Sequence, residues 1–109
     1  MSLFGDYIKE RGNREILEEE YGFVTYVFSS KEECYLEDMY IVPKYRRQKY
    51  ASKLADKLFV IAKEHGMKSV YTTVVPSTNG SNESLAGCLQ YGFKLLKTEP
   101  NLIYLIKEV

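Results

Sequence analysis

The stretch YIVPKYRRQKYASKL, residues 40–54, joins a β-branched run to an amphipathic run through a proline. Pro43 has no N–H to donate to a sheet ladder, so we expect it to end a strand. Four cations follow within six residues, and they are Lys44, Arg46, Arg47 and Lys49. Two interpretations of this cluster are open: an ordinary solvated turn, or a binding site for an anion.

The residues after the cluster predict a long helix. From residue 50, apolar side chains recur at helical spacing, at Ala51, Leu54, Ala55, Leu58, Ile61 and Ala62. Gly66 stands where the end of a helix favours a left-handed residue. A helix that begins just after a strand presents free N–H groups and the positive end of its dipole together, and phosphates bind well there. We therefore interpret the turn as a pyrophosphate site, to which the arginines add bidentate donors.

The rest of the chain predicts strands by alternation and further helices by spacing. In chain order, the expected elements are a helix over 3–11, two strands within 15–30 around a turn at Tyr21-Gly22, a strand over 34–42, the long helix, a strand over 68–75, a helix over 83–91, and strands over 93–98 and 102–108. Ser81 or Asn82 is expected to cap the helix over 83–91.

This order of elements predicts a mixed sheet. The first three strands are joined by short turns and should be antiparallel, whereas the strands before and after the long helix should be parallel, with a right-handed crossover. Strand alternation would place Glu37 and Asp38 on opposite faces. The expected fold class is α/β, of a mixed α+β type, with helices against a central mixed sheet in a single domain over residues 1–109.

Composition argues against several classes of protein. The chain holds 15 Lys and Arg against 15 Asp and Glu, so bulk attraction to nucleic acid or to an anionic membrane is not indicated. The 45% hydrophobic share and 28% charged share are those of a globular domain. Cys34, Cys88 and His65 form no recognised metal motif, and no secretory signal or membrane span is evident, so we expect a cytoplasmic protein without a metal.

The central segment resembles the cofactor-binding motif of the GNAT superfamily of acyl-CoA-dependent N-acetyltransferases. That motif is a strand ending in a Val-x-Pro-type turn, then Arg/Gln-x-x-Gly-x-Gly/Ala at the start of a long helix. The matching residues are Val42, Pro43, Tyr45, Arg46, Ala51 and Leu54. The later NESLAGCLQYGFKLL resembles the second conserved helix, which ends in Gly-Phe, here Gly92-Phe93. The resemblance extends from about Gly22 to the end of the sequence and implies that the two parallel strands splay apart.

The chain departs from the superfamily pattern at two positions. Lys49 replaces the central glycine of the phosphate loop, where glycine allows close approach and unusual dihedral angles. Cys88 stands where many members carry the tyrosine that protonates the departing thiolate. Tyr91, one helical turn further on, is a candidate substitute acid, and the alternative is that it packs under the terminal hairpin.

The resemblance implies a set of functional residues. Acetyl-CoA is expected to bind at Tyr40, Ile41, Val42, Arg46, Arg47, Gln48, Lys49, Tyr50, Ala51, Ser52, Asn82 and Ser84. A main-chain N–H of the strand at residues 40–42 would face the thioester carbonyl. Glu37 is the candidate general base. One alternative is that Glu37 is an ordinary exposed carboxylate of an edge strand, and another is that a water chain to bulk solvent takes the proton.

The expected reaction is transfer of the acetyl group of acetyl-CoA to an amine by direct attack in a ternary complex. The acceptor would be a small molecule, a peptide or a protein. By the same resemblance, we expect part of the N-terminal strand and helices of longer members to be missing, and a second subunit is one way to supply the wall of the acceptor cleft. The alternative is a GNAT-like module that binds CoA or a protein partner without catalysis. A nucleic-acid-binding domain is a third hypothesis, disfavoured by the balanced charge.

Overall fold

The computed structural model describes residues 3–12 and 14–109, excepting the side chains of residues 8–12. The elements in chain order are α1 (Leu3–Gly12), β1 (Glu15–Glu19), β2 (Gly22–Phe28), β3 (Glu33–Ile41), the 3-10 helix η1 (Pro43–Tyr45), α2 (Tyr50–Glu64), β4 (Ser69–Val74), α3 (Ser81–Tyr91), β5 (Lys94–Glu99) and β6 (Leu102–Glu108). The predicted order of helices and strands is confirmed.

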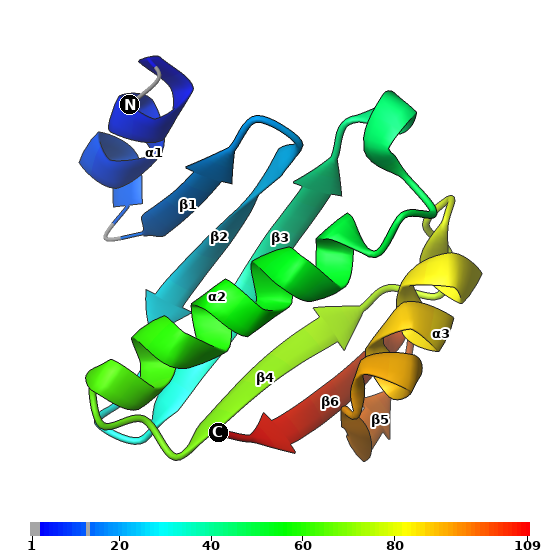
Figure 1. The fold of residues 1–109 in the computed structure, drawn as a ribbon. Coiled ribbons are helices and arrows are strands. Elements are labelled where there is room, and N and C mark those ends of the chain that lie inside the picture. The colour runs from blue at the N-terminus through cyan, green and yellow to red at the C-terminus, as the bar shows by residue number, and fades with distance from the viewer. Residues whose placement is uncertain (1–2, 13) are drawn as a thin grey trace.

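The strands of the described residues form a six-stranded sheet in the order β1-β2-β3-β4-β6-β5. The β3–β4 pair is parallel, and the other neighbouring pairs are antiparallel. In Figure 1, α2 crosses the middle of one face, α3 lies over β6 and β5 on that same side, and α1 lies beside β1. The mixed sheet flanked by helices is therefore confirmed.

The core lies between α2 and the sheet. The buried side chains of α2 are Leu54, Ala55, Leu58 and Ala62, which belong to the predicted stripe. They pack against buried residues of four strands, Val24, Leu36, Val70 and Leu105. Full burial of a leucine side chain contributes roughly 1.5–3 kcal/mol, so this contact fixes the position of α2 and of its first turn.

The parallel strands separate after a short ladder, as the resemblance implied. Residues 33–36 of β3 pair with residues 69–72 of β4. Beyond them β3 continues to Ile41 and β4 to Val74, but the two strands no longer pair with each other. At the last paired position the hydroxyl of Thr72 donates to the carbonyl of Leu36 at 2.8 Å. Beyond it a gap opens between the two strands, toward the end of the sheet where α2 begins (Figure 1).

A β-bulge in β3 overturns one expectation. Thr25 pairs with Asp38 and Tyr26 pairs with Leu36, so Glu37 is the extra residue. Paired residues share a face, and the hydroxyl of Thr25 also donates to Glu37. The prediction that Glu37 and Asp38 lie on opposite faces is therefore wrong, because a bulge interrupts the alternation of side chains.

Two local boundaries also differ from expectation. The first hairpin turns at residues 20–21, and Gly22 lies within β2, where a Cβ would come within 2.1 Å of the carbonyl oxygen of Tyr40. The predicted cap of α3 is wrong. Gly80 is the N-cap with φ 82°, and the hydroxyl of Ser81 donates to the carbonyl of Pro76 instead.

None of the helices in the described residues is long and apolar enough to cross a membrane.

Candidate active site

Free backbone amides gather at the start of α2. Within the part of the chain that the structure describes, the amides of residues 47–52 donate to no backbone acceptor, and the first bond into the helix runs from Lys53 to Lys49. Arg47 and Lys49 have left-handed φ angles of 62° and 68°, and no side chain caps the helix. Successive amides in such turns form a concave anion site, and the helix dipole adds to it.

The predicted cofactor side chains divide into two groups. Arg46 donates from Nε to the carbonyl of Ile41 at 2.8 Å, and its guanidinium lies 5.5 Å from the ring centre of Tyr40. Gln48 donates from Nε2 to the carbonyl of Lys44 at 2.9 Å. The side chain of Arg46 thus ties the loop to the end of β3, and that of Gln48 forms a bond within the loop.

The second group faces solvent beside the free amides. The side chains of Arg47 and Lys49 are exposed, and they make no ion pair with any described residue. Ala51 and Ser52 are also exposed, which leaves the first turn of α2 open to a ligand. The side chains of Arg47 and Lys49 are therefore available to an anion at this site.

An aromatic cluster holds the loop in place. The ring of Tyr50 lies 4.6 Å from that of Tyr21 and 5.2 Å from that of Tyr45, measured between centroids. The hydroxyl of Tyr45 donates to Glu20 at 3.1 Å, and this bond raises the pKa of Tyr45. Tyr21 was not predicted to belong to the site. The only feature of the sequence that could have indicated its contact with the loop was a tyrosine at a predicted hairpin turn.

The separated part of β3 offers main-chain groups to the gap. The amide of Val42 donates to the carbonyl of Tyr21 at 2.8 Å. Main-chain groups alternate along an antiparallel ladder, so those of Tyr40 also point toward β2, and those of Met39 and Ile41 point toward the gap. Of the three predicted positions, Ile41 has an amide directed at the gap, whereas that of Val42 is already bonded. Met39 was not predicted, because the direction of its amide depends on this register.

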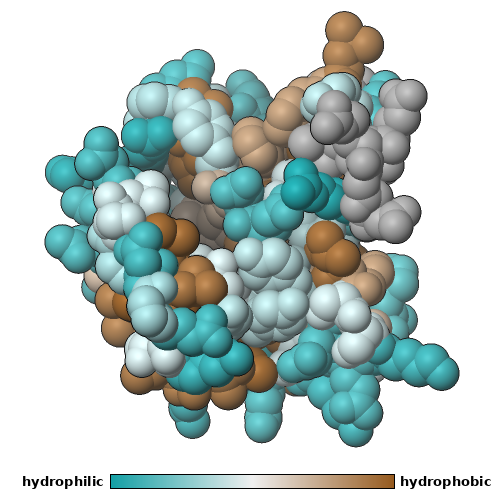
Figure 2. All heavy atoms as spheres, turned by 180° about the vertical axis from the view of Figure 1, so that it is seen from behind, coloured by the Kyte–Doolittle hydropathy of each residue, from teal (hydrophilic) through white to brown (hydrophobic). Residues whose placement is uncertain are grey.

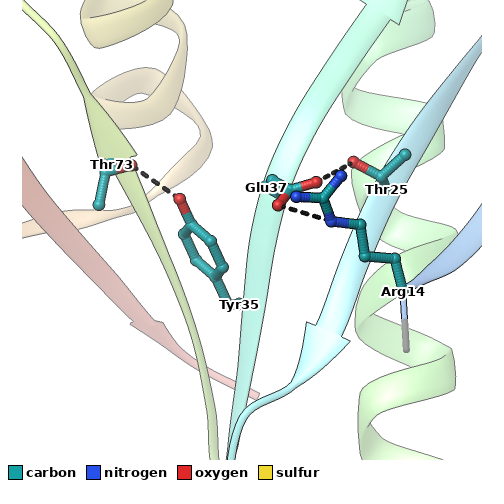
Figure 3. Close-up of polar contacts among 5 residues, drawn as sticks. All are labelled: Arg14, Thr25, Tyr35, Glu37 and Thr73. Atoms are coloured by element: carbon teal, nitrogen blue, oxygen red, sulfur yellow. Dashed lines mark hydrogen bonds and ion pairs between the residues drawn. The ribbon is translucent and has the colours of Figure 1, made fainter. Parts of the chain in front are cut away.

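Glu37 forms a polar cluster on the face opposite α2. Its carboxylate lies 3.1 Å from Nε of Arg14 and accepts a hydrogen bond from Thr25 at 3.3 Å (Figure 3). The side chain of Glu37 is 21% exposed. Glu37 lies just past the last paired residues of β3 and β4, so it stands at the edge of the gap, as the base hypothesis requires.

A tyrosine and a threonine bridge the two strands at the same place. The hydroxyls of Tyr35 on β3 and Thr73 on β4 lie 3.0 Å apart (Figure 3). The ring of Tyr35 stacks on that of Tyr71, with centroids 4.8 Å apart. These residues were not predicted to belong to the site. Tyr35 and Tyr71 occupy paired positions in the two strands that were predicted to be parallel. A tyrosine in each of these strands was the one feature of the sequence that could have indicated the contact.

The contacts of Tyr91 favour packing over proton donation. Its hydroxyl donates to Asp56 on α2 at 2.6 Å, and its ring packs against Phe59 and Phe93. Burial, followed by the bond to Asp56, raises the pKa of Tyr91 well above its usual range. A phenol in this state is a weaker general acid near neutral pH. Cys88 is half-buried, and burial raises the pKa of its thiol.

The remaining predicted residues lie on the first turns of α3. Asn82 and Ser84 are both exposed, and the amide of Ser84 donates to the carbonyl of Gly80 at 3.0 Å. Among the described residues, no group of three or more His, Cys, Asp or Glu side chains could hold a metal ion.

The candidate site thus combines free amides at the start of α2 with main-chain groups in a gap between two strands. Residues 11–93 match the Acetyltransferase (GNAT) family. The chain belongs to this family. No curated protein matches the sequence.

Solved structures share the fold at low sequence identity. PaiA N-acetyltransferase from Thermoplasma acidophilum, in complex with coenzyme A, has a TM-score of 0.77 and 18% identity, over 98% of this chain and 69% of that one. A GNAT family acetyltransferase from Elizabethkingia anophelis with acetyl-CoA bound has a TM-score of 0.75 and 17% identity, over 98% of this chain and 82% of that one. Ard1 from Thermoplasma volcanium has a TM-score of 0.72 and 23% identity, over 82% of this chain but 63% of that one. The chain therefore spans less than two thirds of the length of Ard1.

Proposed function

We propose that this protein is an N-acetyltransferase that moves the acetyl group of acetyl-CoA to an amine in a ternary complex. The observation that carries the proposal is the run of free amides at residues 47–52, set beside the gap between β3 and β4 in a member of the GNAT family. Similar folds with CoA or acetyl-CoA bound support the same cofactor. We further propose that the chain acts as a single domain in the cytoplasm without a metal.

In this proposal the diphosphate of the cofactor binds at the first turn of α2. The amides of residues 47–52 donate hydrogen bonds to its oxygens, and the side chains of Arg47 and Lys49 add charge-assisted hydrogen bonds. Asn82 and Ser84, at the start of α3, face the cofactor from the other side of the gap. The pantetheine arm then extends into the gap along the free main-chain groups of β3.

Transfer requires attack of a neutral amine nitrogen on the thioester carbonyl carbon. The C–N bond forms, the carbonyl oxygen takes the negative charge, and the C–S bond then breaks to release the thiolate. We assign the amide of Met39 or Ile41 to that oxygen, because a fixed donor at a developing oxyanion is among the larger catalytic effects. The excess proton of the amine passes to a base, for which Glu37 is our candidate.

The leaving thiolate needs little help from an acid. A thiol has a pKa near ~8.5, so its conjugate base leaves readily, whereas a positioned acid adds roughly 10²–10⁴ in rate. We therefore propose a slow but competent enzyme in which Tyr91 is not required.

The second candidate function is a CoA-binding or partner-binding module without catalysis. Two observations favour it. The carboxylate of Glu37 is paired with Arg14, and the hydroxyl of Tyr91 is bonded to Asp56. Under this alternative the amide site binds the cofactor, but no group accepts the proton of the amine.

Ligand binding tests the amide site, and turnover separates the two functions. Coenzyme A at 100 times its Kd should raise the free energy of unfolding by about 2.7 kcal/mol, seen as a rise in Tm. Arg47→Glu should abolish that rise, because it places an anion beside the phosphates. The matched control is Lys63→Glu, an exposed charge reversal in the last turn of α2, which should keep the rise. If the unchanged chain shows no rise, the proposal is wrong.

Thiol release from acetyl-CoA, measured across a panel of amines, then shows whether acetyl transfer occurs. Glu37→Gln should spare binding of coenzyme A and lower the rate, and an unchanged pH–rate profile would refute Glu37 as the base. Tyr91→Phe should leave the rate nearly unchanged. Binding of coenzyme A without thiol release from any amine would establish the module instead.

A further inference from the structure

The gap between β3 and β4 is closed at the end where the two strands come together. Their last paired residues are Leu36 and Thr72, joined by the hydrogen bond from the hydroxyl of Thr72 to the carbonyl of Leu36 at 2.8 Å. Figure 2 shows the face of the sheet opposite α2, which is hollowed in its upper half and filled with side chains below the hollow. A molecule that extends into the gap from the first turn of α2 therefore has this closed end in front of it.

Two side chains cross the gap at its closed end, and we call this pair, Tyr35 and Thr73, the clasp. Tyr35 belongs to the paired part of β3, but its hydroxyl reaches past the ladder to the hydroxyl of Thr73 on the separated part of β4, at 3.0 Å (Figure 3). The ring of Tyr35 stacks on that of Tyr71, with centroids 4.8 Å apart and planes inclined by 20°. A hydrogen bond at its tip and a stacked ring along its length thus hold Tyr35 in place.

The hydrophobic core closes the same end of the gap on its other face. Successive side chains of a strand point to opposite faces, so Leu36 and Val74, the neighbours of the clasp residues, point toward α2. Both are buried and belong to the core cluster that contains Leu54 and Leu58 of α2. Side chains in such a core are close-packed, with few voids larger than a water molecule. The closed end therefore lies between the clasp on one face and the packed core on the other.

We propose that the clasp limits the length of the acyl chain that the protein accepts on coenzyme A, and that it selects acetyl over longer acyl groups. This inference rests on the proposed function, in which the pantetheine arm extends from the first turn of α2 into the gap along β3. The acyl carbons lie beyond the sulfur at the end of that arm, so they are the part of the donor that meets the clasp.

Selection follows because the clasp resists displacement. An added methylene must push aside Tyr35, Thr73 or the core behind them, and extra methylenes forced into a packed site are destabilising. Moving Tyr35 also breaks its hydrogen bond to Thr73 and its stacking on Tyr71. Contacts of this kind discriminate between substrates that differ by one methylene by about tenfold or more. The clasp is thus assigned a role in choosing the acyl donor, and it takes no part in proton transfer.

The experiment compares acetyl-CoA, propionyl-CoA and butyryl-CoA as donors to one amine, with thiol release as the measurement. The kcat/KM of the unchanged chain should fall about tenfold for each added methylene. Thr73→Ala removes a hydroxyl and a methyl group from the clasp, so it should reduce the preference for acetyl-CoA over butyryl-CoA about tenfold. Tyr35→Phe keeps the ring and should reduce the preference less. The ratio of two donors on one variant does not depend on the folded fraction, so a loss of stability alone leaves it unchanged.

Matched controls remove the same groups from neighbouring strands. Tyr104→Phe removes a tyrosine hydroxyl from the residue of β6 that pairs with Thr73, where it is bonded to Glu99. Thr98→Ala removes a threonine side chain from the exposed strand β5. Both variants should keep the preference of the unchanged chain. The inference is overturned if the unchanged chain uses butyryl-CoA as well as acetyl-CoA, or if Thr73→Ala keeps the full preference.

A direct binding measurement separates the failure of this inference from failure of the proposed function. Calorimetry without an amine should show a Kd for butyryl-CoA about tenfold or more above that for acetyl-CoA, and Thr73→Ala should bring the two values close together. Preferential binding of acetyl-CoA without thiol release to any amine overturns the proposed enzyme and leaves the role of the clasp standing. Equal binding and equal use of the two donors overturn the inference while acetyl transfer stands. Absence of binding by every acyl-CoA overturns both.

Discussion

At the scale of single residues, Lys49 shows how the phosphate loop keeps its shape without the glycine of the family pattern. Its backbone lies in the left-handed region, at φ 68° and ψ 16°, which glycine adopts without strain. For a residue with a Cβ this conformation costs about 1–2 kcal/mol. The direction of the neighbouring amides depends on that conformation, so the loop keeps these amides free at a cost in stability.

Replacing this lysine should therefore stabilise the protein. Lys49→Gly should raise the free energy of unfolding by about 0.5–1 kcal/mol, because the relief of strain exceeds the greater unfolded-state entropy of glycine. Urea denaturation measures the change. The matched control, Lys53→Gly in the interior of α2, should lower the free energy of unfolding by about 1 kcal/mol. A lower stability for Lys49→Gly would contradict the strain argument.

At the scale of elements, β3 has two halves with different tasks. Its first half is paired on both sides, and Cys34 there is fully buried. Its second half, beyond the bulge at Glu37, pairs with β2 alone and leaves main-chain groups for the gap. The tightly packed first half thus holds the open second half in position.

The buried thiol of Cys34 gives this packing a pH signature. Burial raises the pKa of Cys34 from 9.0 to about 11. The thiol ionises at lower pH in the unfolded chain than in the folded one. The contribution of the neutral thiol to the free energy of unfolding is therefore complete below pH 9. It is lost as the pH rises toward 11, which lowers the free energy of unfolding by about 2–3 kcal/mol. Urea denaturation between pH 8 and pH 11 measures the loss. Cys34→Ala should reduce the pH dependence of the free energy of unfolding more than Cys88→Ala does, since Cys88 is only half-buried. Equal slopes in the two variants would show that Cys34 is not the group responsible.

At the scale of the whole molecule, the sheet ends in edge strands. Strand β5 forms one edge and is exposed along its whole length, with Leu95 and Leu96 at 61% and 52% exposure. An exposed apolar edge of this kind invites pairing with another chain. We propose a homodimer through β5.

Sedimentation velocity at micromolar concentrations tests this assembly. The unchanged chain should sediment as a dimer, and the double variant Leu95→Lys, Leu96→Lys should sediment as a monomer, because two buried charges oppose the interface. Val60→Lys, at another exposed apolar position on α2, should remain dimeric. A monomeric mass for the unchanged chain at all concentrations refutes the proposal.

The order of elements followed from sequence alone, and so did the hypothesis that places the cofactor site at the start of α2. Local spacing determined α2, since apolar residues recur on one side of it, and Pro43 ended β3 because it lacks an N–H. The cations at residues 44–49 marked the start of α2 as an anion site, and the motifs around it indicated the family. These features depend on residues close together in the chain, so local chemistry specifies them.

Only the tertiary structure decided which groups face the gap. The bulge at Glu37, the ion pair with Arg14 and the bond from Tyr91 to Asp56 join segments far apart in sequence. The register of β2 against β3 then directs the amides of Met39 and Ile41. A shift of one residue would turn each group to the other side, and that register is set by packing across the whole sheet, which no local pattern encodes.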